Sequence, residues 1–124
     1  MKKIGILGAG GQADEIESYL PIDTVSFKAV GKDYLLPETN LIDILCPTLE
    51  QRNTDVISAI GAPAVRQFLL DQWPGVQYAT IVSESAMVSD SLSISSGSLV
   101  SPGAVITSNV KIGQHTIVNI GATI

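Results

Sequence analysis

Residues 82–124 repeat a six-residue pattern, and this repeat restricts the possible folds more than any other feature of the sequence. The first position of all eight units is valine or isoleucine: Val82, Val88, Ile94, Val100, Ile106, Ile112, Val118 and Ile124. Since these two residue types make up about a fifth of the chain, chance would give this order roughly once in 10⁵. The repeat therefore predicts a solenoid, in which each unit packs on its neighbours.

The other positions of the unit indicate how the chain turns. The fifth position is small or medium-sized, and the third and fourth hold turn formers such as Pro102-Gly103 and Ser108-Asn109. Six residues then make one short strand and one corner of a triangular coil, with the β-branched first residue pointing inward. Such a coil winds left-handed, an exception to the usual right-handed crossover. A β-sandwich is the alternative, but it does not keep a six-residue phase.

Residues 1–79 show a different pattern, in which short apolar runs alternate with helical spacing. Strands are predicted at 3–7, 25–30, 55–60 and 76–79, and helices at 12–20 and 64–73. The core face of the second helix is predicted to consist of Val65, Phe68, Leu69 and Trp73. The predicted fold class is therefore α/β: a small Rossmann-like parallel-sheet domain in residues 1–79, followed by the first coils of a left-handed parallel β-helix in residues 80–124.

The loop after the first strand is a candidate phosphate-binding site. Its residues satisfy the dinucleotide fingerprint G-x-G-x-x-A: Gly8, Ala9, Gly10, Gly11, Gln12 and Ala13. Glycines let the backbone approach a pyrophosphate, and the helix that follows presents free N–H groups. The motif alone suits NAD as well as a sugar nucleotide, and a plain strand-to-helix turn is the structural alternative.

Three more residues are candidates for the same site. Asp33 is a candidate nucleoside contact, Gly61 is expected to line the crevice, and Arg66 could reach a phosphate from the first turn of its helix. The alternatives are a solvated loop charge for Asp33 and a surface ion pair for Arg66. His115, the only histidine, is predicted to occupy a corner with its side chain outward, so no catalytic residue is assigned. No Cys/His cluster predicts a metal site.

Charge and hydropathy argue against two classes of partner. The net charge is -5, and the seven Lys and Arg form no basic run beyond Lys2-Lys3, so no nucleic-acid partner is expected. No apolar stretch approaches the roughly 20 residues that span a bilayer, so no membrane insertion is expected. The single Cys46 is predicted to be a small buried hydrophobe. One cysteine and no signal-peptide pattern favour the cytoplasm.

The glycine loop, the Ala59-Ile60-Gly61 strand end and the hexapeptide repeats together resemble the acetyltransferases of bacterial surface-sugar biosynthesis. The chain is similar to sialic acid O-acetyltransferases and to enzymes that N-acetylate amino-dideoxy sugars on UDP or dTDP. This resemblance implies that the first domain binds a nucleotide-linked sugar, that the β-helix forms a homotrimer, and that acetyl-CoA is the co-substrate. Gln12 stands where many relatives have histidine, and it cannot serve as a base near pH 7.

In that family a histidine on the β-helix acts as general base, shortly after an Asn-x-Gly-Ala-x-Val/Ile stretch. Residues 119–124, Asn-Ile-Gly-Ala-Thr-Ile, match that stretch. The resemblance therefore implies a C-terminally truncated chain that binds the nucleotide sugar, lacks the catalytic histidine and has little affinity for acetyl-CoA. A small NAD-dependent oxidoreductase and a non-catalytic trimerising module are the alternatives.

Overall fold

The computed structural model describes residues 2–35 and 40–124. It divides into two compact units, Met1–Gln77 (unit 1) and Tyr78–Ile124 (unit 2). The sequence pattern predicted a boundary between residues 79 and 80. Within the described residues, none of the helices has the length and hydropathy needed to cross a membrane.

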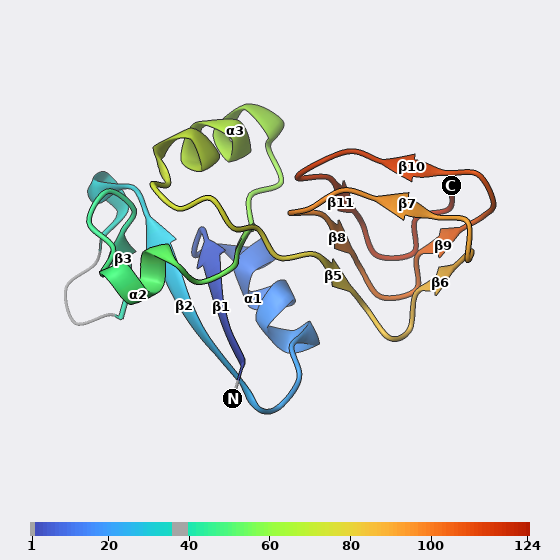
Figure 1. The fold of residues 1–124 in the computed structure, drawn as a ribbon, viewed down its shortest axis with the longest axis horizontal. Helices are drawn as coiled ribbons and strands as arrows, with labels where there is room; N and C mark the ends of the chain where they lie inside the picture. The colour runs from blue at the N-terminus through green and yellow to red at the C-terminus, as the bar shows by residue number, and fades with distance from the viewer. Residues whose placement is uncertain (1, 36–39) are drawn as a thin grey trace. The chain divides into compact units, whose positions relative to one another are not determined.

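Unit 1 is built on a parallel four-stranded sheet in the order β3-β2-β1-β4, of which Figure 1 labels β1, β2 and β3. Its strands are β1 (Lys2–Leu7), β2 (Thr24–Val30), β3 (Ile42–Asp43) and β4 (Val56–Ser58). In the central strand β1, Gly5 lies in register with Phe27 of β2 and Val56 of β4. A Cβ atom on Gly5 would overlap both of these side chains, so glycine lets them fill the space over β1.

The helical segments of unit 1 cover both faces of this sheet. They are α1 (Gly11–Tyr19), the 3₁₀ turn η1 (Lys32–Tyr34), α2 (Leu49–Arg52) and α3 (Pro63–Gln72). Successive side chains of a strand point to opposite faces. Lys28 forms ion pairs with α1, whereas the preceding Phe27 packs on Trp73, the C-cap of α3, with ring centroids 6.1 Å apart. The helix α1 and the end of α3 therefore lie on opposite faces.

Three predictions made for residues 1–79 are wrong in whole or in part. Residues 76–79 form no strand; the Val56 N–H donates to the Gln77 carbonyl at 3.1 Å, but the extended pairing of a fifth strand is missing there. In α3, Val65 and Phe68 are 47% and 59% exposed. Leu69 and Trp73 are buried as predicted, and Leu70 takes the place of Val65 and Phe68 in the buried stripe. Cys46 is exposed, not buried.

Unit 2 is a triangular parallel coil, as the six-residue repeat predicted. Its two-residue strands are β5 (Ile81–Val82), β6 (Met87–Val88), β7 (Ser93–Ile94), β8 (Leu99–Val100), β9 (Val105–Ile106), β10 (Lys111–Ile112) and β11 (Ile117–Val118). They form three separate parallel sheets: β5-β8-β11, β6-β9 and β7-β10 (Figure 1). Each residue pairs with the one 18 positions along, as in Ile81↔Leu99, so three sides of six residues complete one coil.

The interior of the coil follows the repeat phase. First-position and fifth-position residues form the buried cluster: Val100, Ala104, Ile106, Ile112 and Val118. First-position side chains at the two ends of the coil are more exposed, at 41% for Val82 and 45% for Ile124. Val100, which has a stacked coil on each side of it, is fully buried.

From Gly97 onward, the fourth-position residues make the corners of the coil in the left-handed backbone region. Positive φ angles occur at Gly97, Gly103, Asn109, His115 and Gly121. Glycine and asparagine tolerate this region better than other residues, which explains the turn formers in the repeat. Serine side chains link successive coils there; the Ser91 Oγ, for example, accepts the Asn109 N–H at 2.9 Å.

Candidate functional site

The loops that follow β1, β2 and β4 leave the sheet at the same edge. Leu7 lies in register with Ala29 of β2 and Ser58 of β4. Just beyond, the Gly8 N–H donates to the Ala29 carbonyl at 2.8 Å, and the Ala59 N–H donates to the Leu7 carbonyl at 2.9 Å. In parallel sheets, ligands bind outside the carboxyl ends of the strands, so these three loops define the candidate site of unit 1.

Gly8 makes the tight turn out of β1. Its φ of +128° lies in a region that side-chain-bearing residues avoid. A Cβ atom there would lie 3.0 Å from the Ile60 Cδ1 and 3.3 Å from the Ala59 carbonyl oxygen. Glycine therefore lets the loop after β1 pass close to the loop after β4.

Gly10 and Gly11 serve a different purpose, because a Cβ atom on either of them would meet nothing within 4 Å. Gly10 is the N-cap of α1 and offers no side-chain cap. Its carbonyl accepts the N–H groups of Ala13 and Asp14 at 3.1 and 3.2 Å. The N–H groups of Gly11 and Gln12 precede the first intrahelical bonds, as at every helix start, and face an exposed loop. This arrangement offers donors and a positive dipole end to an anion.

A charged cluster lies on α1 beside this helix start. Lys28 of β2 contacts Asp14 at 3.1 Å and Glu17 at 2.5 Å. The hydrogen bond to Glu17, followed by that to Asp14, raises the pKa of Lys28 against the opposing effect of desolvation. Asp14 is the acidic residue of the first turn, so its pairing with Lys28 offsets a negative charge close to the candidate anion site.

Gly61 and Arg66 follow β4, at the carboxyl end of the sheet. Gly61 is exposed, and a Cβ atom on it would meet nothing within 4 Å. The half-buried Arg66 donates from Nη1 to the Ile60 carbonyl at 3.1 Å. The surface ion pair that was the alternative for Arg66 does not form within the described residues. The guanidinium is thereby held at the end of β4.

The η1 turn after β2 carries Asp33, which is exposed. It also carries Tyr34, whose side chain is 75% exposed and which the sequence pattern did not predict as a site residue. The signal that could have identified Tyr34 is an aromatic residue in the loop that follows the second predicted strand, because loop residues are more often polar. The structure therefore brings the glycine loop, Asp33, Gly61, Arg66 and Tyr34 to the same end of the sheet, and their role in binding stays a prediction.

His115 of unit 2 has a half-buried side chain. It occupies a corner, with φ of +56°, but its ring packs edge-on against Tyr78 at a centroid distance of 4.5 Å and an interplanar angle of 86°. The ring also lies so close to Gly97 that a Cβ atom there would overlap it. These contacts indicate that His115 stabilises a corner of the coil. The described residues contain no cluster of three or more His, Cys, Asp or Glu side chains that could hold a metal ion.

No family model and no curated protein matches the chain. Several solved structures are similar to it. A histidine-to-asparagine variant of perosamine N-acetyltransferase from Caulobacter crescentus, in complex with CoA and GDP-perosamine, is 25% identical with a TM-score of 0.81. PerB from the same organism, with the same ligands, is 26% identical with a TM-score of 0.78. Both matches cover 100% of this chain and 63% of the other chain, so the chain spans just under two thirds of their length.

A third structure shares the fold. The acetyltransferase domain of PglB from Neisseria gonorrhoeae, in complex with acetyl coenzyme A, is 21% identical with a TM-score of 0.74. That match covers 99% of this chain and 64% of the other. The chain is thus similar to hexapeptide-type acetyltransferases of solved structure, which supports the resemblance in broad terms.

Proposed function

We propose that this chain is the nucleotide-sugar-binding part of an acetyl-CoA-dependent acetyltransferase of bacterial surface-polysaccharide biosynthesis, acting on a nucleotide-linked amino sugar or sialic acid. The observation that carries the proposal is the similarity over the whole chain to two N-acetyltransferase structures that hold CoA and GDP-perosamine. The glycine loop of unit 1 and the 18-residue coil of unit 2 are both included in that similarity.

Unit 1 is proposed to be a Rossmann-like domain that binds the nucleotide sugar. Its strand order β3-β2-β1-β4 agrees with the first half of a doubly wound dinucleotide fold. The diphosphate is assigned to the N–H groups at the start of α1, next to the bare Gly10 and Gly11. Asp33 is assigned to the nucleoside, and Gly61 with Arg66 to the phosphate and sugar on the β4 side. Ala9 and Gln12 complete the loop, with Gln12 as a neutral hydrogen-bonding group.

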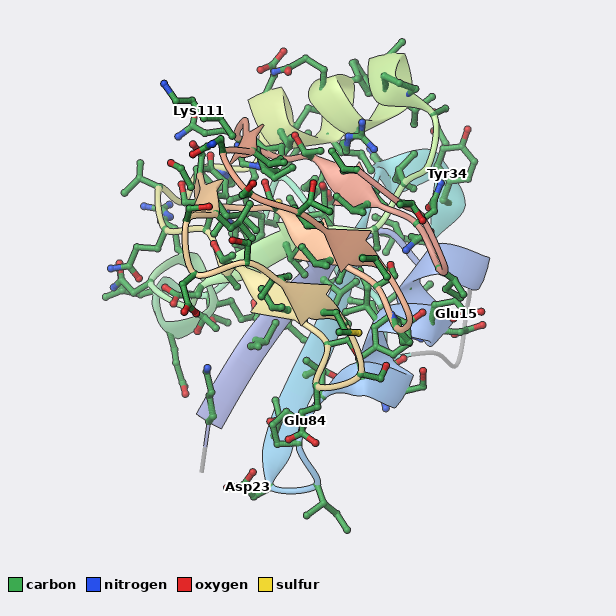
Figure 2. All side chains as sticks on the ribbon, turned by 90° about the vertical axis from the view of Figure 1, so that its right-hand side faces the viewer. Glu15, Asp23, Tyr34, Glu84 and Lys111 are labelled. Carbon is green, nitrogen blue, oxygen red and sulfur yellow. The ribbon has the colours of Figure 1, made fainter. Side chains whose placement is uncertain are left out.

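Unit 2 is proposed to be part of a left-handed β-helix through which the whole protein forms a homotrimer. The outward row of the β6-β9 sheet carries the 70% exposed Met87 next to Val105, an apolar surface suited to a second copy. Acetyl-CoA, which would supply the acetyl group, is proposed as co-substrate of the whole protein. Lys111, an exposed residue (Figure 2), is the one Lys or Arg within residues 78–124. Unit 2 therefore does not by itself fit the several phosphates of CoA, and no catalytic role is assigned to its residues.

Calorimetric titration of the purified chain tests the binding proposal directly. The ligands are GDP-, UDP- and dTDP-linked amino sugars, with NAD as the control. We expect saturable binding of a sugar nucleotide that is lost in Gly10→Val, because the valine side chain would occupy the open space beside the free N–H groups. The variant should keep the wild-type fold, since Gly10 has a φ of -93° that any residue adopts.

The other outcomes separate the alternatives. Binding of NAD alone would contradict the proposal and favour an oxidoreductase. A stable trimer that binds none of these ligands would favour an assembly module. The cytoplasmic location and the absence of a nucleic-acid partner stay predictions from the sequence.

A further inference from the structure

We propose that the ring of Tyr34 is the surface on which the nucleobase of the bound nucleotide stacks. This inference rests on the proposed function and deepens it by naming the group that recognises the base. The starting observation is exposure: Tyr34 is 75% exposed, and among the aromatic side chains of the described residues the only other exposed one is Phe68 on α3.

The position of Tyr34 in the fold makes this exposure informative. The η1 turn follows β2 directly, and β2 is the immediate neighbour of β1, whose end carries the glycine loop. The Gly8 N–H donates to the Ala29 carbonyl, so the glycine loop starts beside the end of β2. The η1 turn begins three residues after Ala29, at Lys32. Neighbouring strands lie about 4.8 Å apart. A ligand whose diphosphate lies at the α1 start can therefore extend its nucleoside toward η1.

Local contacts hold the ring at this edge without covering it. The Tyr34 N–H donates to the Gly31 carbonyl at 2.9 Å, which closes the turn. The Tyr34 Cδ2 would lie 3.6 Å from a Cβ atom on Gly31, so the ring edge lies beside the glycine backbone. Figure 2 shows the Tyr34 side chain projecting away from the ribbon. A ring fixed at one edge and open to solvent can accept a planar base at little ordering cost.

The chemistry of the turn suits a nucleoside. Aromatic side chains stack with every base through its π-face, and one such contact changes affinity on the order of 10-fold. Asp33, the preceding residue, provides a carboxylate of the kind that accepts ribose hydroxyl groups in dinucleotide folds. Base, ribose and diphosphate would then lie against Tyr34, Asp33 and the start of α1 in that order.

A single exposed apolar side chain is common on protein surfaces, so the experiment needs a matched control. Ile22 is fully exposed at 106% and precedes β2, at the opposite edge of the sheet from η1. The variants are Tyr34→Ala, Tyr34→Phe and the control Ile22→Ala. The titrants are GDP, which has an aromatic base, and ribose 5-diphosphate, which has none.

We expect Tyr34→Ala to bind GDP about 10-fold more weakly than the wild type and ribose 5-diphosphate equally well. Tyr34→Phe should keep wild-type affinity, because stacking uses the ring and not the hydroxyl group. Ile22→Ala should match the wild type with both titrants. In Tyr34→Trp, fluorescence quenching by GDP but not by ribose 5-diphosphate reports the stack directly, while the buried Trp73 gives a constant background.

Each remaining outcome overturns the inference. If the wild type binds GDP and Tyr34→Ala binds it equally well, the stacking assignment is wrong while the proposed function stands. If Tyr34→Ala weakens both titrants equally, the ring supports the turn and does not contact the base. If the wild-type chain binds no nucleotide or nucleotide sugar, the proposed function fails and the inference fails with it.

Discussion

Replacement of Gly8 by alanine is the substitution whose cost the structure defines most closely. Two separate effects act at this position. A residue with a Cβ atom at φ of +128° is strained by on the order of 1–3 kcal/mol. The same Cβ atom lies 3.0 Å from the Ile60 Cδ1, which can rotate away, and 3.3 Å from the Ala59 carbonyl oxygen, which belongs to the backbone. We therefore expect Gly8→Ala to lower the free energy of unfolding of unit 1 by about 2–4 kcal/mol.

Gly10→Ala is the matched control in the same loop. Its φ is -93°, and the added Cβ atom meets nothing within 4 Å. Loss of glycine at an N-cap without a side-chain hydrogen bond costs less than about 1 kcal/mol. The two variants therefore add the same methyl group two residues apart, with different expected effects on stability.

Urea denaturation followed by tryptophan fluorescence measures this difference. Trp73 is the only tryptophan of the chain and is buried in unit 1, so its emission reports the unfolding of that unit. We expect the midpoint of Gly8→Ala to fall well below that of Gly10→Ala, with the same dependence on urea concentration. Equal midpoints would refute the argument, because neither the positive φ nor the contact with the Ala59 carbonyl would then have a measurable cost.

Three further predictions concern stability. Lys28→Met should destabilise unit 1 by about 1 kcal/mol. The folded-state pKa of Lys28 is raised above 10.5, so this loss of stability should be equal at pH 7 and pH 9. It should vanish only as the pH passes the raised pKa. Gly97→Ala should destabilise unit 2, measured by thermal unfolding, and His115→Ala in the same chain should recover part of the loss, since the imidazole occupies the Cβ position; additive effects would contradict this. Ile106→Ala, at a 2% exposed position inside the coil, should cost about 2–5 kcal/mol by circular dichroism in urea, whereas a loss under 1 kcal/mol would contradict inward packing.

The coil could be predicted closely from the sequence because one physical condition sets its phase. A first-position residue must point into the prism in every unit, so the same β-branched type recurs every six residues and the register follows. The 18-residue pairing of Met87 with Val105 is the direct consequence. No partner outside the repeat is needed to determine it.

Helix α3 shows where sequence reasoning fails. Apolar residues at positions 65, 68, 69, 70 and 73 satisfy two helical stripes, one containing Val65 and Phe68 and the other containing Leu70. Periodicity cannot choose between stripes that differ by one residue. The choice depends on what the sheet presents to the helix, and Phe27, which fills the space over Gly5 and packs on Trp73, is part of that surface.

Backbone geometry explains why the glycine loop was predictable from the sequence. Gly8, Gly10 and Gly11 belong to a motif whose spacing is set by a strand, a turn and a helix start. Tyr34 and Lys28 have no such spacing. Their positions become informative only after the sheet places η1 beside the glycine loop and turns Lys28 toward Asp14.

A plain strand-to-helix turn explains only one of the three glycines of the motif. Such a turn accounts for Gly8, whose positive φ and close contact with the next loop exclude a side chain. It does not account for Gly10 and Gly11, where a side chain would meet nothing within 4 Å. A serine or aspartate at Gly10 would cap α1 better than glycine does, by a few tenths of a kcal/mol. A capping side chain would accept the N–H groups that a phosphate needs, so two bare positions at an uncapped helix start agree with the proposed anion site.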